Sequence, residues 1–182
     1  MAAIHETAYP RFKPYFTSKE LDEVFALSHD EIAFLNRRTK ASNAVSRLAF
    51  AILLKCYQYL GRPINVSKVS IGIKQYVSKQ LSIDFNTDLI SYSKATFKHH
   101  KKAIRAYLDI NTDRRQRRQA MKQSALEAAQ TKENLADIIN CVIEELFCKR
   151  YELPAYQTLV RLARAARTVT NNGHYRKINN SL

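Results

Sequence analysis

The sequence predicts an all-α fold built from two packed helical subdomains. Three glycines and four prolines among 182 residues are few, against roughly 7% and 5% in average proteins. A chain this poor in turn-forming residues is usually helical, because β folds need many tight turns. Apolar residues make up 46% of the chain, enough for a real core. We place the subdomains at residues 1–110 and 111–182, with a helix-turn-helix-like pair of helices near the C-terminus.

The first subdomain begins with an extended, aromatic-rich arm over residues 1–16, which two prolines interrupt. Two capping boxes follow, Thr17 with Glu20 and Ser28 with Glu31. In such a box the hydroxyl caps the first turn while the glutamate reaches back to a free amide. Each box therefore predicts the start of a short helix.

Residues 44–60 are mostly apolar all round, which predicts a central buried helix. Gly61-Arg62-Pro63 should end it, because glycine caps helix ends and proline cannot extend a helix. A further helix is expected over residues 69–81, followed by a loop and short turn over 84–91.

Residues 92–108 form an amphipathic helix when they are placed at about 100° per residue. His100 falls inside its apolar face, where a hydrogen-bonded core histidine is more common than a ligand. The adjoining face is cationic and has no acidic partner at helical spacing before Asp109, whereas a merely solvated face usually mixes signs. Lysines read no base sequence, so this face is expected to contact phosphates. It comprises Lys94, Lys98, Lys101, Lys102 and Arg105.

In the second subdomain, Asn111-Thr112-Asp113 is expected to cap a basic, then alanine-rich helix over residues 113–130. Four arginines in its first turns oppose the positive end of the helix dipole. That placement costs stability unless an anion is bound there, which favours a phosphate contact. These residues are Arg114, Arg115, Arg117 and Arg118.

Two helices complete the second subdomain. Residues 133–149 are strongly periodic, and residues 150–153 form a tight connection. Pro154 then starts another helix at its favoured first position. This last helix should run to about Thr170, and Asn171-Asn172-Gly173 should end it.

The last two helices have helix-turn-helix proportions. The inward residues of the second helix are predicted to be Ala155, Leu159, Leu162, Ala166 and Val169. Its outward face would carry Gln157, Arg161, Arg164 and Thr168, flanked by Tyr156 and Arg167. Glutamine and arginine can make bidentate contacts to base edges, and threonine can reach bases or phosphates. The spacing alone leaves open an ordinary solvated helix in an α-hairpin.

The net charge of +14 is confined to two segments. Residues 94–122 hold ten Lys/Arg and two Asp, and residues 149–182 hold seven Lys/Arg and one Glu, while the rest of the chain sums to zero. Confined positive charge attracts polyanions from a distance and displaces their counterions, so the expected partner is nucleic acid. A smaller cluster, Arg37, Arg38 and Lys40, is either a further phosphate contact or a solvated turn.

Several other classes of function are disfavoured. The three cysteines lack CxxC or Cys/His ligand spacing, so we expect no metal and a reducing cytoplasm. Phosphate-loop, dinucleotide and nucleophile-elbow motifs are missing from the sequence, and we expect no catalytic residues and no cofactor. The longest apolar run, residues 48–54, is too short for a membrane span, and the basic helices lack the bulky apolar face of a membrane-surface helix.

An ordered set of segments resembles the start of Tn3-family transposases. The match covers residues 16–182, although Ala49 stands where relatives tend to have glycine. No one motif is specific, whereas the ordered set is. The segments are Arg37-Arg38, Asn43, Arg47-Leu48-Ala49-Phe50-Ala51, Tyr76-Val77-Ser78-Lys79-Gln80-Leu81, His100-Lys101-Lys102-Ala103-Ile104-Arg105 and Tyr151-Glu152-Leu153-Pro154-Ala155-Tyr156-Gln157-Thr158-Leu159.

This resemblance implies a role in transposition and a bacterial, nucleoid-associated location in the cytoplasm. The family's N-terminal helical region binds the terminal inverted repeats of the transposon as duplex DNA. Its RNase H-like catalytic domain lies far downstream, and nothing in this chain corresponds to it. The expected partners are therefore inverted-repeat DNA and the remainder of the transposase, whose full-length form could be dimeric.

Two rival functions stay open. One is an RNA-binding helical module, although sequence-specific RNA readers usually stack bases on exposed aromatics and most aromatics here sit at core spacing. The other is a protein-interaction module whose basic face docks an acidic partner.

Overall fold

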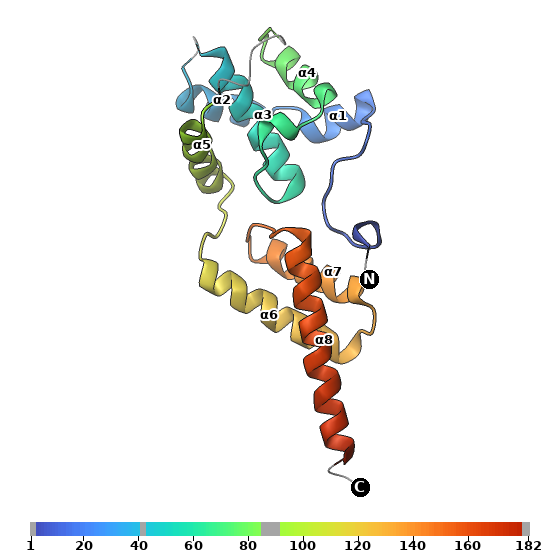
Figure 1. Ribbon diagram of the computed structural model, residues 1–182. Helices are drawn as coiled ribbons and strands as arrows, with labels where there is room; N and C mark the ends of the chain where they lie inside the picture. Colours follow the sequence, from blue (N-terminus) through green and yellow to red (C-terminus); the bar gives the residue numbers. More distant parts are fainter. Residues whose placement is uncertain (1–2, 41–42, 85–91, 180–182) are drawn as a thin grey trace. The chain divides into compact units, whose positions relative to one another are not determined.

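The computed structural model describes residues 3–40, 43–84 and 92–179, with side chains described as far as Asn172. Within these ranges the chain forms α-helices and 3-10 turns and has no β-strand, as predicted (Figure 1). None of the helices described is long and apolar enough to cross a membrane. The helices are α1 (Ser18–Phe25), α2 (His29–Arg38), α3 (Ala44–Leu60), α4 (Ile71–Gln80), α5 (Lys94–Tyr107), α6 (Arg114–Thr131), α7 (Leu135–Cys148) and α8 (Tyr156–Asn179), with 3-10 turns η1 (Ile4–Glu6) and η2 (Val66–Lys68).

The chain folds into two compact units, which we name after their helices. Residues 11–109 form the α1–α5 unit, and residues 1–10 together with 110–182 form the α6–α8 unit. The sequence predicts residues 1–110 as one subdomain, whereas the structure places the first ten residues with the second unit. The reason is Tyr9, which is 4% exposed and packs into the core formed by α6, α7 and α8.

Helix α3 is the centre of the α1–α5 unit, and its predicted bounds are confirmed. Every side chain from Leu48 to Tyr57 is buried. The helix ends at Gly61, whose φ of 64° is left-handed and whose N–H donates to the Tyr57 carbonyl at 2.9 Å. Helices α1, α2, α4 and α5 all pack against α3, so their outer faces form the surface of this unit.

Both predicted capping boxes are present. The Thr17 hydroxyl accepts a hydrogen bond from the Glu20 N–H at 3.3 Å, and the Glu20 carboxylate accepts one from the Thr17 N–H at 2.9 Å. The same reciprocal bonds join Ser28 and Glu31, at 3.2 Å and 2.8 Å. Local sequence therefore fixes where α1 and α2 begin.

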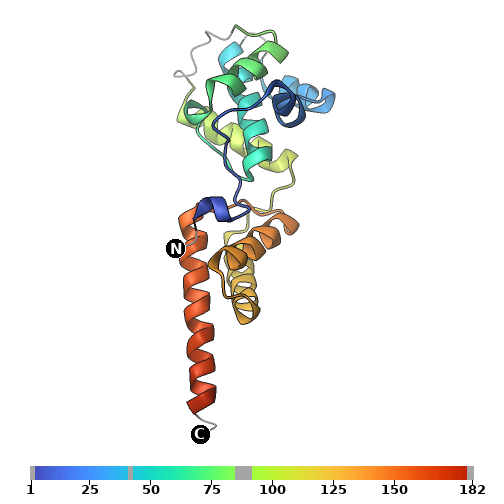
Figure 2. The same cartoon turned by 90° about the vertical axis from the view of Figure 1, so that its right-hand side faces the viewer.

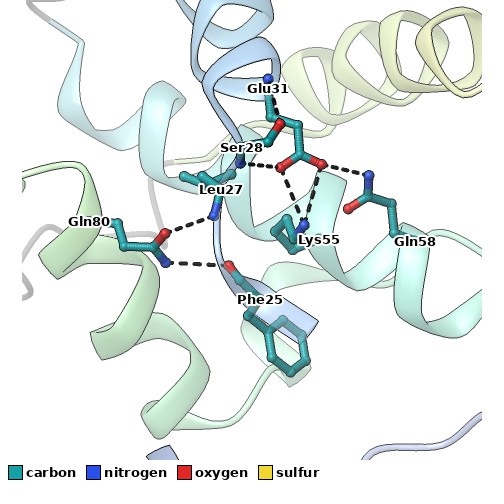
Figure 3. Close-up of polar contacts among 7 residues, drawn as sticks. All are labelled: Phe25, Leu27, Ser28, Glu31, Lys55, Gln58 and Gln80. Carbon is teal, nitrogen blue, oxygen red and sulfur yellow. Dashed lines mark hydrogen bonds and ion pairs between the residues drawn. The ribbon is translucent and has the colours of Figure 1, made fainter. Parts of the chain in front are cut away.

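Glu31 also belongs to a buried ion pair within the mostly apolar core (Figure 3). The Lys55 Nζ of α3 lies 3.3 Å from both of its carboxylate oxygens, and Gln58 Nε2 donates to Oε1 at 2.7 Å. The side chains of Lys55 and Glu31 are only 10% and 7% exposed. Buried charges persist only when they are paired and hydrogen-bonded, so this cluster fixes the start of α2 against the middle of α3.

The other predicted helices of this unit differ from the observed ones by one or two residues at each end. Helix α4 starts after the extra turn η2 and ends at Gln80, whose side chain accepts from the Leu27 N–H at 2.7 Å and donates to the Phe25 carbonyl at 3.3 Å (Figure 3). Most of the loop expected over residues 84–91 lies outside the described residues.

In the α6–α8 unit, α6 packs along both α7 and α8 (Figures 1 and 2). The alanine-rich part of α6 faces inward, where small side chains let the three helices approach closely. Bulkier aliphatic side chains of α7 and the first half of α8 fill the remaining space. The buried residues are Ala120, Met121, Ala125, Ala128, Ala129, Ala136, Ile138, Ile139, Val142, Ile143, Leu146, Leu159, Val160, Ala163 and Ala166.

Both predicted ends of the last helix are wrong. Pro154 precedes α8 instead of occupying its first turn, and the helix begins at Tyr156. It then continues through Asn171-Asn172-Gly173 to Asn179 and projects past α6 and α7 (Figure 2). A glycine inside a helix costs only about 1 kcal/mol, and no proline follows Gly173 to break the hydrogen-bond ladder.

Candidate nucleic-acid interface

Helix α5 begins where Ser93 caps it, since its hydroxyl accepts from the Thr96 N–H at 3.0 Å. Its inner side is buried through His100, Ala103 and Ile104. The predicted cationic side faces outward: Lys94, Lys98 and Lys102 are exposed, and Lys101 and Arg105 are half-buried. In the described part of the chain, those three exposed lysines form no ion pair. Their charge is therefore available to an external anion.

The predicted core role of His100 is confirmed. The residue is 3% exposed, its Nδ1 lies 2.7 Å from the Tyr92 hydroxyl and its Nε2 lies 3.4 Å from the Ser46 hydroxyl. The Phe50 ring packs 4.5 Å away, centroid to centroid. Burial, together with the weaker effect of the neighbouring His99, lowers the pKa of His100 to about 4. A neutral, enclosed imidazole of this kind anchors α5 to α3.

The smaller cluster of Arg37, Arg38 and Lys40 lies at the end of α2 and is exposed. The rings of Phe34 and Tyr107 stack with centroids 4.1 Å apart, which joins the second half of α2 to the last turn of α5. The end of α2 that carries this cluster therefore lies beside the last turn of α5 within one unit. We call the combined set the α2/α5 cationic surface: Arg37, Arg38, Lys40, Lys94, Lys98, Lys101, Lys102 and Arg105.

A cavity of about 220 Å³ opens beside the first turn of α5. Phe97 and Tyr92 supply its aromatic walls, with their rings nearly perpendicular at 85°. Lys94 and Asn65 add polar groups to the lining, and Lys101 Nζ lies 5.7 Å from the Phe97 ring centroid. Two partly exposed aromatics beside lysines form a surface that the sequence, which assigns most aromatics to the core, does not predict.

At the start of α6 the expected cap is confirmed. The Asp113 carboxylate accepts hydrogen bonds from the N–H groups of Arg115 and Gln116 at 2.8 and 3.0 Å. This carboxylate supplies the negative charge that the helix dipole favours, so it offsets part of the cost of the four nearby arginines. Arg114, Arg115 and Arg118 are exposed.

Arg117 differs from the other three arginines because it turns inward. It is half-buried, and its Nη1 lies 3.5 Å from the Glu152 carbonyl. The neighbouring Tyr151 hydroxyl donates to Gln116 at 3.2 Å. Arg117 thus helps to hold the connector between α7 and α8 and is less accessible to an external phosphate.

The polar face predicted for the last helix is exposed at Gln157, Arg161, Arg164 and Thr168, with Arg167 half-buried. Two of these side chains bond their own helix: Arg161 Nε donates to the Gln157 carbonyl at 3.3 Å, and the Thr168 hydroxyl donates to the Arg164 carbonyl at 3.0 Å. The guanidinium of Arg164 points to no described partner. We call these residues, together with the exposed Arg114, Arg115 and Arg118 of α6, the α6/α8 cationic surface.

The predicted inward face of α8 is partly wrong. Leu159 and Ala166 are buried and Leu162 is half-buried, but Ala155 is exposed and Val169 is 61% exposed. Val160 and Ala163 take their place in the core. Alanine occurs on every side of this helix, so apolar periodicity defines its inward direction poorly.

Helices α7 and α8 are joined by residues 149–155, a longer link than the turn of about three to four residues in a helix-turn-helix. An isolated parallel bridge joins Asn111 to Tyr151, and the Asn111 N–H donates to the Arg150 carbonyl at 2.8 Å. These contacts hold the link against the residues that precede α6.

The sequence does not reveal one set of contacts at the start of α8. The half-buried Tyr156 packs edge-on against Tyr9, with ring centroids 5.4 Å apart, and the Tyr9 hydroxyl donates to the Pro154 carbonyl at 2.7 Å. Tyr156, predicted as a DNA contact, thus has a packing role as well. An aromatic beside a proline in the arm is the only sequence signal for this docking.

The described residues contain no group of three or more His, Cys, Asp or Glu placed to hold a metal ion. Burial raises the pKa of the Cys56 thiol to about 12, so this cysteine is not a nucleophile near neutral pH.

No curated protein matches the sequence. A family model described as a domain of unknown function (DUF4158) matches residues 1–166, which is nearly the whole chain. The chain therefore belongs to the DUF4158 family.

Proposed function

We propose that this chain binds duplex DNA and recognises a defined base sequence, as the terminal-inverted-repeat-binding region of a Tn3-family transposase. In this proposal it presents the transposon ends to a catalytic domain elsewhere in the transposase and does not itself cut or join DNA. It would act in the bacterial cytoplasm, associated with the nucleoid.

The observation that carries the proposal is the row of exposed lysines on α5. Lys94, Lys98 and Lys102 share one side of a helix whose other side is buried, and they have no acidic partner in the described chain. Uncompensated cations in a row gain free energy when they displace counterions from a phosphate backbone. The resemblance to Tn3-family transposases implies terminal inverted repeats as the DNA that is bound, and it does so independently of this charge.

The two cationic surfaces divide the work in this proposal. The α2/α5 surface is rich in lysine, and lysine is a point charge that positions a duplex without reading it. The α6/α8 surface carries Gln157, Arg161 and Arg164, side chains that can make paired hydrogen bonds to base edges. Sequence preference should therefore depend on α8, and overall affinity should depend on both surfaces.

A second candidate function is binding of RNA or another unpaired strand, and the cavity beside α5 favours it. Unpaired bases stack on partly exposed aromatics beside cations, and Phe97, Tyr92 and Lys94 provide that combination. The cavity holds little more than one ring, whereas the exposed cations extend over several helices. The larger surface suits the duplex better.

The test of the proposed function is selection from a pool of DNA duplexes with a randomised central segment. We expect one sequence to be enriched, and we expect it to occur in inverted orientation at both ends of the mobile element that encodes the chain. A pool that stays random over repeated rounds contradicts sequence-specific binding.

Competition separates the rival functions. A structured RNA at equal phosphate concentration should displace little of the selected duplex. RNA binding would be favoured instead if RNA displaces the duplex from the wild-type chain and Phe97→Leu abolishes this displacement. The control variant Phe147→Leu on α7 should leave the displacement unchanged. Failure to bind any nucleic acid, together with binding to an acidic protein, would favour the protein-docking module.

A further inference from the structure

The arm of residues 3–10 is built into the α6–α8 unit. Its turn η1 places Ile4 against the core of the three helices. The Ala8 N–H donates to Asn140 Oδ1 of α7 at 2.8 Å, and Tyr9 beside it is 4% exposed. Contacts between residues more than a hundred positions apart therefore hold the arm in place.

Tyr9 makes its main contacts where α8 begins. Its hydroxyl donates to the Pro154 carbonyl at 2.7 Å, two residues before the helix starts. Its ring meets the ring of Tyr156, the first residue of α8, at 62° and a centroid distance of 5.4 Å. One side chain thus fixes both the connector that enters α8 and the first turn of the helix.

We propose that Tyr9 is a positioning residue for sequence recognition and sets the direction in which the first turns of α8 present Gln157 and Arg161. This inference rests on the proposed function. Residues near the N-terminal end of a recognition helix are those that contact base edges. A binding group must be held within about 0.5 Å of its productive geometry, so a loosened first turn loses base contacts before it loses phosphate contacts.

The described buried side chains of α8 lie in its first half. They end at Ala166, and Val169 is 61% exposed. The helix is therefore held along its first half, and the Tyr9 contacts lie at the very start of that half. A change there affects the residues that the proposal assigns to base contact.

The experiment uses Tyr9→Phe in the full chain. Phenylalanine keeps the ring against Tyr156 and removes the hydroxyl, so the Pro154 carbonyl loses its partner. A hydrogen bond contributes about 0.5–1.5 kcal/mol, so affinity for the selected duplex should fall roughly 2- to 10-fold, while affinity for a scrambled duplex stays constant. Tyr15→Phe is the matched control, because Tyr15 lies outside residues 3–10 and is 76% exposed.

A second variant tests the arm without touching Tyr9. Asn140→Ala removes the acceptor of the Ala8 N–H and should lower the ratio of selected to scrambled affinity in the same direction. Hydrogen exchange of the amides of residues 158–162 should be faster in both variants, which measures the loosening of α8 without DNA.

Three results would overturn the inference. An unchanged affinity ratio in both variants means that the arm does not position α8. Equal losses on the two duplexes mean that the arm supports only overall stability. If the wild-type chain binds the selected and the scrambled duplex equally, the proposed function itself is wrong. The wild-type measurement alone shows this, before any variant is compared.

Discussion

At the scale of single residues, the basic side chains of α5 take two contrasting roles. Lys98 and Lys102 are exposed, have no ion-pair partner among the described residues, and add positive charge to the surface. His100, only two positions away on the same helix, is enclosed and neutral. Opposite roles on one helix give a direct way to separate loss of binding from loss of fold.

The buried histidine should make stability depend on pH. Its pKa is about 4 in the folded chain and about 6.5 when unfolded, so the unfolded state binds the proton more tightly. The stabilising contribution is complete above pH 6.5 and is lost as the pH falls towards 4. We expect the urea midpoint to fall more between pH 7 and pH 4.5 in the wild type than in His100→Gln.

His99→Gln is the control for this pair of titrations, because His99 is exposed on the same helix. It should keep most of the wild-type pH dependence, because burial is the larger of the two causes of the lowered His100 pKa. A His100→Gln chain with the same pH dependence as the wild type would show that His100 is not the group that titrates.

The exposed lysines should contribute affinity without sequence preference. Lys98→Ala combined with Lys102→Ala should weaken the selected and the scrambled duplex by similar factors and make the salt dependence shallower. The matched control is Lys19→Ala with Lys79→Ala, which removes the same charge from exposed positions on α1 and α4. A changed base preference in the first variant would show that α5 reads bases.

At the scale of helices, the same local motif occurs with and without a buried charge. Both α1 and α2 start with a capping box, but Glu20 pairs with the exposed Lys13 and Glu31 pairs with the buried Lys55. Surface ion pairs contribute little to stability, whereas breaking a buried pair leaves an uncompensated charge. The two boxes therefore form a matched comparison within one unit.

Lys55→Met should lower the free energy of unfolding by about 3–5 kcal/mol, because Glu31 would stay buried without its cation. Glu31→Gln keeps a residue that can complete the capping box but leaves the Lys55 ammonium unpaired. The double variant should lose less stability than the two single variants added together. A double-mutant cycle of unfolding free energies measures this difference. The control Lys13→Met, at an exposed ion pair, should change stability much less. If the losses from the Glu31 and Lys55 variants are additive, the two residues are not coupled.

Helix α8 should carry the base preference. Arg161→Ala or Arg164→Ala should cost about 1–3 kcal/mol on the selected duplex if either side chain contacts guanine, with a much smaller loss on the scrambled duplex. Lys132→Ala, an exposed cation at the end of α6, is the control for lost charge. Equal losses on both duplexes would assign α8 to backbone contact.

The helices show where sequence patterns suffice. The bounds of α3, both capping boxes and the inward histidine of α5 follow from local spacing, and the structure agrees with all of them. The inward direction of α8 does not follow, because alanine is compatible with either side of a helix. The end of α8 does not follow either, because asparagine and glycine only weaken a helix.

At the scale of the whole molecule, the contacts that escape prediction join distant residues. Lys55 meets Glu31 across 24 positions, and Tyr9 meets Pro154 across 145. No periodicity within one helix contains such pairs, so a lysine in an apolar helix and a tyrosine in an arm give no sign of their partners. The exposed cations can be predicted from sequence, because a charged side chain on the outer face of a helix is identified by helical spacing alone, without knowledge of any distant contact.

Both units present cations, so the whole chain should respond to salt as a polyanion-binding protein. The measurement that tests this most directly is the dissociation constant for the selected and for the scrambled duplex between 50 and 200 mM salt, a range chosen because such binding weakens about 10³- to 10⁵-fold across it. We predict a linear log–log plot with a slope of about −0.9 per phosphate contacted, and tighter binding of the selected duplex at every salt concentration. Affinity that stays flat across this range, or that is equal for the two duplexes, would contradict sequence-specific binding of DNA by this chain.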